Sequence, residues 1–231
     1  MLPIKALRKV SAIDYPGRLA TTVFVGGCNF RCPYCYNVEL VLSPDGMPDI
    51  PEHEVLSLLS DRVGFIDGVC VGGGEPTIHP ELPEFLERVK EMGLLVKLDT
   101  NGSRPEVVEE LLERGLVDYV AMDFKTSPEK YGRAVGVEPP MDAIMRTVEL
   151  LKSSDIEYEF RTTAVPGIVD EGDVRRIGEL LRGARLYAIQ QFRPWRTLDP
   201  RMAEVKPYTE EELRRLAEVA RPYFGKVIVR L

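Results

Sequence analysis

Short apolar runs alternate with helical stretches along most of this chain, and this alternation constrains the fold more than any other feature. In residues 81–92, for example, apolar side chains recur every three or four positions, and Gly93 ends the pattern. The expected strands are residues 4–10, 21–25, 69–71, 94–98, 117–122, 157–165, 186–192 and 226–231. The expected helices are residues 51–62, 81–92, 141–151 and 174–181, with one between Ser103 and Gly115 and one after Thr209.

A strand, a helix and a second strand at this spacing form a parallel unit with a right-handed crossover. We count about six such units, fewer than the eight of a closed barrel. The sequence therefore predicts an α/β fold, a partial TIM-like barrel with a short N-terminal extension in which residues 4–10 form an edge strand. A length of 231 residues favours one domain over 1–231. Ser103 is expected to cap the helix that follows it, and Thr209 with Glu212 to form a capping box.

Charge and hydropathy exclude two classes of partner. The formal net charge of −7 argues against nucleic-acid binding, which requires basic clusters. No apolar run approaches the roughly 20 residues of a membrane-spanning helix, and no signal peptide opens the chain. We expect a cytoplasmic protein without a membrane partner. Three of its four cysteines cluster, which in a reducing compartment favours metal binding over disulfides.

The clustered cysteines are Cys28, Cys32 and Cys35, in a loop that follows the strand 21–25 with the spacing C-x3-C-x2-C. A structural zinc site almost always takes four protein ligands, and no fourth cysteine or histidine lies in this loop. Three thiolates suit an iron–sulfur cluster that keeps one iron free for another ligand. We therefore favour a cluster over zinc, which stays the alternative.

With Tyr34 before the last cysteine, the loop resembles the C-x3-C-x-aromatic-C signature of the radical S-adenosylmethionine (radical SAM) enzymes. In that family the three cysteines hold a 4Fe-4S cluster, whose unique iron binds the amino and carboxylate groups of SAM. One electron then cleaves SAM into methionine and a 5′-deoxyadenosyl radical. The resemblance implies a (β/α)6 barrel at this chain length, with Tyr34 against the adenine of SAM.

Polar residues follow several expected strands, and in barrel folds the loops after the strands converge on the active site. The run Gly72-Gly73-Gly74-Glu75-Pro76 follows the strand 69–71. By itself it is more typical of a tight turn between a strand and a helix than of a ligand site. It resembles the GGE motif of radical SAM enzymes, which implies that Gly73, Gly74 and Glu75 hold the amino group of SAM.

Asp99-Thr100 and Asp123 end the next two strands, and two carboxylates facing one pocket suit a hard cation, although either could simply cap a helix. The pattern D-T-N-G followed by D-F-K resembles the activases of glycyl-radical enzymes. It implies that Asp99, Thr100 and Asp123 bind a monovalent cation that touches SAM, and that Lys125 orients SAM. Arg161, in the strand 157–165, is expected either to contact SAM or to pair with an acid.

The resemblance extends from the DYPG motif at residues 14–17 to the QFRP motif at residues 191–194. It implies an anaerobic enzyme that installs a glycyl radical on a partner, as activators of ribonucleotide reductase and pyruvate formate-lyase do, with ferredoxin or flavodoxin as electron donor. Two departures stand out. Tyr36 follows Cys35 where formate-lyase activases usually have histidine, and no histidine lies near the strand 186–192.

Two other functions stay open. One is a radical SAM enzyme that acts on a small molecule, such as the carboxydeazaguanine synthases, which usually have a threonine at the position of Tyr36. The other is a non-enzymatic metal-binding or electron-transfer module. Such a module would not need Glu75, Asp99 and Asp123 around its cluster.

Overall fold

The computed structural model describes all residues from 1 to 231 and contains one eight-stranded sheet, whose strands lie side by side in chain order. The strands are β1 (Ile4–Ser11), β2 (Ala20–Val25), β3 (Gly68–Gly73), β4 (Leu95–Thr100), β5 (Tyr119–Asp123), β6 (Glu157–Ala164), β7 (Leu186–Gln191) and β8 (Lys226–Arg230). β1 runs antiparallel to β2, and every later neighbour is parallel.

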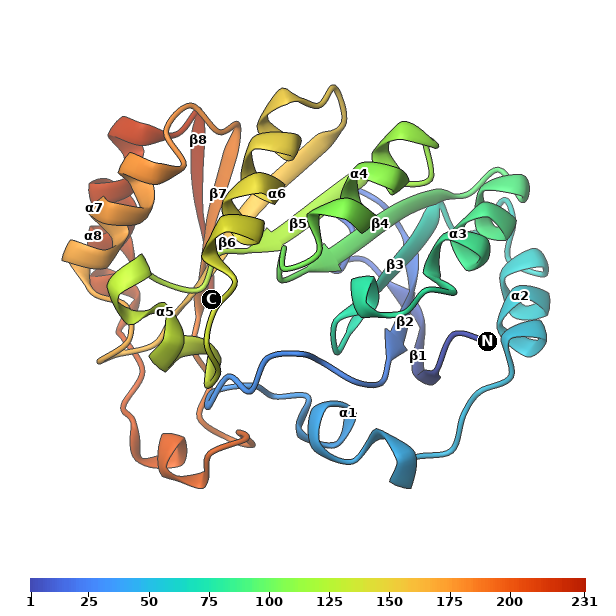
Figure 1. Cartoon of the computed structure of the whole chain (residues 1–231), viewed down its shortest axis with the longest axis horizontal. Helices are drawn as coiled ribbons and strands as arrows, with labels where there is room; N and C mark the ends of the chain where they lie inside the picture. Colours follow the sequence, from blue (N-terminus) through green and yellow to red (C-terminus); the bar gives the residue numbers. More distant parts are fainter.

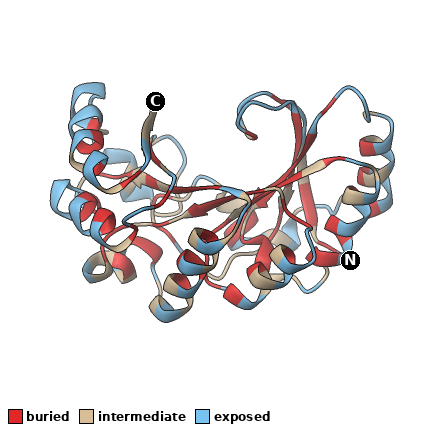
Figure 2. Ribbon diagram, turned by 90° about the horizontal axis from the view of Figure 1, so that it is seen from above, coloured by how far each residue is buried: buried red, intermediate tan, exposed pale blue.

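The sheet curves, and the helices cover its outer side (Figures 1 and 2). β1 and β8 stand at opposite ends of the strand order, so the barrel is not closed. The predicted α/β partial barrel is confirmed, and the edge strand near the N-terminus forms its short extension. The last stretch, 226–231, contributes the strand β8 that completes the parallel series.

The helices are α1 (Val38–Leu42), α2 (Glu52–Ser60), α3 (Leu82–Glu91), α4 (Pro105–Glu113), α5 (Pro128–Val135), α6 (Met141–Ser153), α7 (Glu171–Leu180) and α8 (Glu210–Ala220). All the predicted helices are present. The helices α1 and α5, of 5 and 8 residues, were not predicted, because so few turns give a weak periodic pattern. None of these helices has the length and apolar character needed to cross a lipid bilayer.

The two predicted helix caps had opposite outcomes. Thr209 and Glu212 form the capping box of α8, with each side chain accepting from the backbone N–H of the other residue. The prediction that Ser103 caps α4 was wrong, because Arg104 is the residue that precedes the helix and no side chain caps its first turn. The backbone N–H of Ser103 instead donates to Oδ1 of Asn101, 2.9 Å away.

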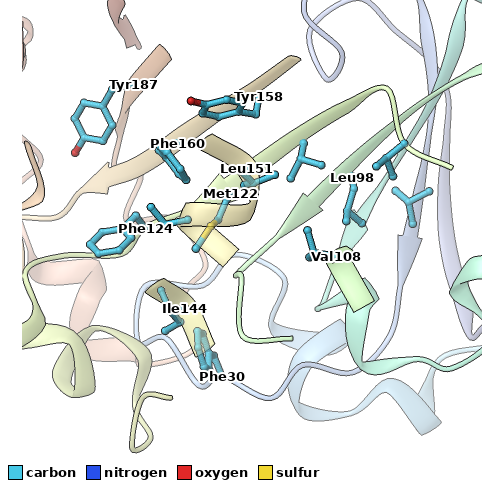
Figure 3. Close-up of a cluster of buried hydrophobic side chains, with 14 of the residues drawn as sticks. Phe30, Leu98, Val108, Met122, Phe124, Ile144, Leu151, Tyr158, Phe160 and Tyr187 are labelled. Carbon is cyan, nitrogen blue, oxygen red and sulfur yellow. The ribbon is translucent and has the colours of Figure 1, made fainter. Parts of the chain in front are cut away.

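The main core lies between the sheet and its helices (Figure 3). Side chains from β4 to β7, among them Leu98, Met122 and Phe160, face Val108 of α4 and Ile144 of α6. Phe30, from the cysteine loop, belongs to the same buried cluster. Removing a buried phenylalanine side chain typically lowers the free energy of unfolding by about 3–5 kcal/mol. The burial of Phe30 therefore stabilises the position of the cysteine loop against the core.

Candidate active site

A cavity of about 350 Å³ opens at the carboxyl ends of the parallel strands. Most of its lining comes from the loop after β2, the turn after β3 and the ends of β4 to β7. Every candidate residue from the sequence contributes to it: Cys28, Cys32, Tyr34, Cys35, Gly73, Gly74, Glu75, Asp99, Thr100, Asp123, Lys125 and Arg161. The fold thus gathers these residues, which are spread over more than half of the chain, around one space.

Backbone hydrogen bonds tie the cysteine loop to two distant segments of the chain. The N–H of Arg31 donates to the carbonyl of Val135, 2.7 Å away, and the N–H of Leu198 donates to the carbonyl of Cys35 at 3.1 Å. Gly136 has a φ of 68°, and a side chain there would overlap the carbonyl oxygen of Arg31. This glycine therefore lets α5 end directly against the loop.

The three thiols fit an iron–sulfur cluster better than a single metal ion. No three His, Cys, Asp or Glu side chains converge as the ligands of one ion would. In a four-iron cluster each cysteine binds a different iron, so the thiols need only surround one space, which they do. Burial raises the pKa of Cys28 to about 12 and that of Cys32 to about 11. A metal must therefore displace protons from these thiols when it binds.

The turn after β3 requires glycine at two positions. Gly73 has a φ of 107°, and a Cβ on Gly74 would overlap the carbonyl oxygen of Gly27 in the cysteine loop. The side-chain amide of Asn37 donates to the carbonyl of Gly73 at 2.7 Å. Asn37 was not among the candidate residues, although its position just after the cysteines could have suggested it. The two loops are therefore packed backbone to backbone.

Glu75 is 1% exposed and accepts four hydrogen bonds from the protein. Its Oε1 accepts from the N–H of Thr77 at 3.1 Å, from the hydroxyl of Thr77 at 2.6 Å and from the hydroxyl of Thr100 at 2.7 Å. Its Oε2 accepts from the N–H of Asn101 at 2.6 Å. Burial raises the pKa of Glu75, although these donors counteract it. The carboxylate therefore ties the turn after β3 to the end of β4, and its contact with SAM stays a prediction.

Arg161 bridges the two aspartates of the site. Its Nε donates to Asp123 at 2.7 Å, and its Nη1 donates to Asp99 at 3.0 Å. Lys125 pairs with the other oxygen of Asp123 at 3.0 Å, and Lys97 pairs with Asp99. Burial would raise the pKa of both carboxyl groups, but Arg161 and the lysines outweigh it and hold both below their usual range.

Three cations, Arg161, Lys125 and Lys97, therefore pair with the two carboxylates at this side of the cavity. Arg161 was expected either to contact SAM or to pair with an acid, and the structure shows the pairing with an acid. The monovalent cation at Asp99, Thr100 and Asp123 stays a prediction, because both carboxylates are already ion-paired. Lys125 lines the cavity, and its ammonium group suits a ligand that carries a carboxylate.

Two tyrosines of the cysteine loop differ in their partners. Tyr34 is 5% exposed, and its hydroxyl is buried without a hydrogen-bond partner. A buried hydroxyl without a partner destabilises the folded protein, so this atom is a candidate contact for a ligand. Tyr36 is exposed, and its hydroxyl accepts from the N–H of Arg193 at 2.7 Å. It thereby joins the cysteine loop to the segment after β7.

Residues 22–180 match the sequence profile of the radical SAM superfamily. The chain belongs to this superfamily. A protein of Methanocaldococcus jannaschii, named provisionally as a glycyl-radical enzyme activating enzyme, is 36% identical over 98% of this chain and 95% of its own. The pyruvate formate-lyase-activating enzyme of Clostridium pasteurianum is 27% identical over 84% of this chain and 82% of its own. The resemblance to the activase branch is thus confirmed, and the chain is an enzyme.

Solved structures share this fold. Streptococcus suis SuiB superposes with a TM-score of 0.70 at 14% identity, over 89% of this chain and 47% of SuiB. The same protein bound to S-adenosylmethionine gives a TM-score of 0.68 over 88% of this chain. This radical SAM enzyme therefore spans about half the length of these structures, and at such low identity the likeness concerns the fold alone.

Membership of the superfamily implies a 4Fe-4S cluster and SAM as cofactors. In this radical SAM enzyme the thiols of Cys28, Cys32 and Cys35 are the side chains that fit the cluster, for the reasons given above. When bound, the cluster supplies the electron for the reductive cleavage of SAM. The remaining candidate residues surround the rest of the same cavity, where SAM would bind.

Proposed function

We propose that this radical SAM enzyme uses the 5′-deoxyadenosyl radical to abstract a hydrogen atom from a backbone glycine of a partner glycyl-radical enzyme. The observation that carries the proposal is the similarity to the M. jannaschii relative, which covers nearly the full length of both chains. A match of that extent includes the loops around the cavity as well as the barrel. The clostridial activating enzyme supports the same assignment at lower identity.

The chain's own residues would bind and orient SAM. Tyr34 has a free buried hydroxyl beside the cysteines, and we assign it to the adenine end of SAM. Gly73 and Gly74 line the cavity, and we assign their backbone carbonyl groups to the amino group of SAM. The ammonium group of Lys125 lines the cavity and can bind the carboxylate of SAM. Arg161 fixes the position of Asp123 and thereby that of Lys125.

The open side of the barrel gives a protein substrate a way in. The cavity lining includes the exposed Tyr36, from the loop after β2, and Gln190, near the end of β7. These residues come from the two flanks of a sheet that does not close. An extended segment that carries the partner's glycine would enter between them. Protein groups around the radical then exclude water and other quenchers.

A small-molecule substrate is the second candidate. The 7-carboxy-7-deazaguanine synthase of Methanopyrus kandleri is 34% identical, but only over 48% of this chain and 51% of its own. Tyr36 replaces the threonine that those enzymes usually have after the third cysteine. The partial match and this residue favour the protein substrate.

The test is an anaerobic activation assay. The reconstituted enzyme is reduced with dithionite and mixed with SAM and a glycyl-radical enzyme from the same organism, and electron paramagnetic resonance is recorded. We expect a glycyl doublet that requires SAM and is absent with Cys32→Ala. If 5′-deoxyadenosine forms without a doublet from any glycyl-radical enzyme of the organism, the activase assignment is wrong and a small-molecule substrate replaces it. If neither forms, SAM cleavage itself is refuted.

A further inference from the structure

We propose that a basic groove on the outer side of the cysteine loop is the docking site for a small acidic protein that delivers single electrons. We call it the arginine groove, and its defining residues are Arg31, Pro33, Arg133, Leu198, Asp199 and Arg201. It has a volume of about 620 Å³ and shares no lining residue with the SAM cavity. The inference rests on the proposed function in one respect: the group held by the cysteines must be reduced from outside.

The groove and the cavity lie on opposite sides of a single stretch of backbone. Arg31 and Pro33 line the groove, whereas Cys32 between them lines the cavity and is only 8% exposed. One peptide segment therefore separates this surface from a cluster-binding thiol. Because electron transfer slows steeply with distance, a carrier that docks in the groove has a short route to the cluster.

The walls of the groove are fixed to the cysteine loop by hydrogen bonds. On one side the N–H of Asp199 donates to the carbonyl of Pro33 at 2.9 Å. On the other side the N–H of Arg31 donates to the carbonyl of Val135, at the end of α5. The segment after β7 accordingly runs beside the cysteine loop in Figure 1. The docking surface is thus preformed, which lowers the entropic cost of binding.

Charge identifies the kind of partner. The chain as a whole carries a formal charge of −7, yet three arginines face one carboxylate in this groove. Arg201 pairs with Asp199 at 2.7 Å, whereas neither Arg31 nor Arg133 pairs with a carboxylate. The guanidinium of Arg31 donates to the carbonyls of Cys28 and Phe30, which holds it over the cysteine loop. A local positive patch on an acidic protein attracts an acidic carrier and orients it.

The two proteins that this enzyme needs could bind at the same time. A glycine-bearing segment would enter the SAM cavity, and the carrier would dock on the outer side of the cysteine loop. For each turnover the carrier is oxidised by one electron. That electron and one from the broken sulfur–carbon bond become the lone pair of methionine, and the other bond electron stays on the 5′ carbon. No proton transfer is needed in this step.

The test reverses the charge of arginines at the outer rim of the arginine groove and leaves the residues of the cysteine loop unchanged. The variants are Arg133→Glu and the double variant Arg133→Glu with Arg201→Glu, since both side chains are exposed. The matched control is Arg62→Glu, on the loop that precedes β3 and therefore at the opposite ends of the strands. Binding of an oxidised acidic ferredoxin to each reconstituted protein is measured by isothermal titration calorimetry at low and high salt.

We expect the double variant to bind ferredoxin about tenfold more weakly than the wild type at low salt, with a smaller dependence on salt. The control should bind as the wild type does. Formation of 5′-deoxyadenosine should fall in the double variant when reduced ferredoxin is the donor and stay unchanged with dithionite. Unchanged ferredoxin affinity in the double variant overturns the docking site. If the wild type forms no 5′-deoxyadenosine with dithionite, the proposed function is wrong instead. The calorimetry would still show whether ferredoxin docks in the arginine groove.

Discussion

Glu75 offers a quantitative test of how the turn after β3 is built. In Glu75→Ala, the backbone N–H groups of Thr77 and Asn101 lose their acceptor, while the two threonine hydroxyls can rotate toward other partners. Two buried N–H groups without acceptors cost about 2–6 kcal/mol in total, at about 1–3 kcal/mol each. In Glu75→Gln, the amide oxygen can replace Oε1, and only the bond from Asn101 is lost. That substitution should cost about 1–3 kcal/mol.

The assay is urea unfolding of the metal-free proteins under reducing conditions, with Glu84→Ala as the control. Glu84 is exposed on α3, so its removal should change the free energy of unfolding by less than about 0.5 kcal/mol. SAM affinity of the reconstituted proteins is measured in parallel. If Glu75→Ala unfolds like the wild type yet no longer binds SAM, Glu75 is a direct ligand and the structural role given to it here is wrong.

Three further substitutions test other parts of the site. Cys32→Ser should abolish cluster loading, as measured by iron and sulfide content, and a variant that still loads a full cluster would contradict the ligand assignment. Arg161→Leu leaves Asp99 and Asp123 without their shared partner and should lower the free energy of unfolding by about 3 kcal/mol at neutral pH. Because these carboxyl groups have a lowered pKa in the folded protein, that difference should shrink as the pH falls below about 4; a constant difference would argue against the pairing. Tyr34→Phe removes a hydroxyl without a partner, so it should leave stability unchanged or raise it while weakening SAM binding in calorimetry; equal SAM affinity would remove that contact.

Much of the fold could be predicted from local patterns. The strands and the longer helices follow from apolar periodicity, and the parallel arrangement follows from their alternation. The capping box of α8 was predictable because its two residues lie three positions apart. Ser103 shows the limit of such reasoning. Its hydroxyl accepts from the side-chain amide of Asn29 in the cysteine loop at 2.7 Å, a long-range contact that no local pattern reveals.

The site was predictable as a set of residues but not as a set of contacts. Strand order alone brings the cysteine loop, the glycine turn and the strand-end acids to one edge of the sheet. The bridge from Arg161 to Asp123 depends on register, because these residues face each other across β5 and β6. Two of the four hydrogen bonds to Glu75 similarly come from the end of another strand, from Thr100 and Asn101 of β4 and the turn after it. The arginine groove unites residues 31, 133 and 201, a separation over which sequence patterns carry no information.

The measurement that tests the central claim most directly follows a single hydrogen atom. The partner glycyl-radical enzyme is prepared with glycine deuterated at the α-carbon and incubated anaerobically with the reduced radical SAM enzyme and unlabelled SAM. Mass spectrometry then measures deuterium in the 5′-deoxyadenosine. We predict one deuterium in each 5′-deoxyadenosine formed in step with the glycyl radical. A partner that acquires its radical while the 5′-deoxyadenosine stays unlabelled would contradict direct abstraction from the glycine.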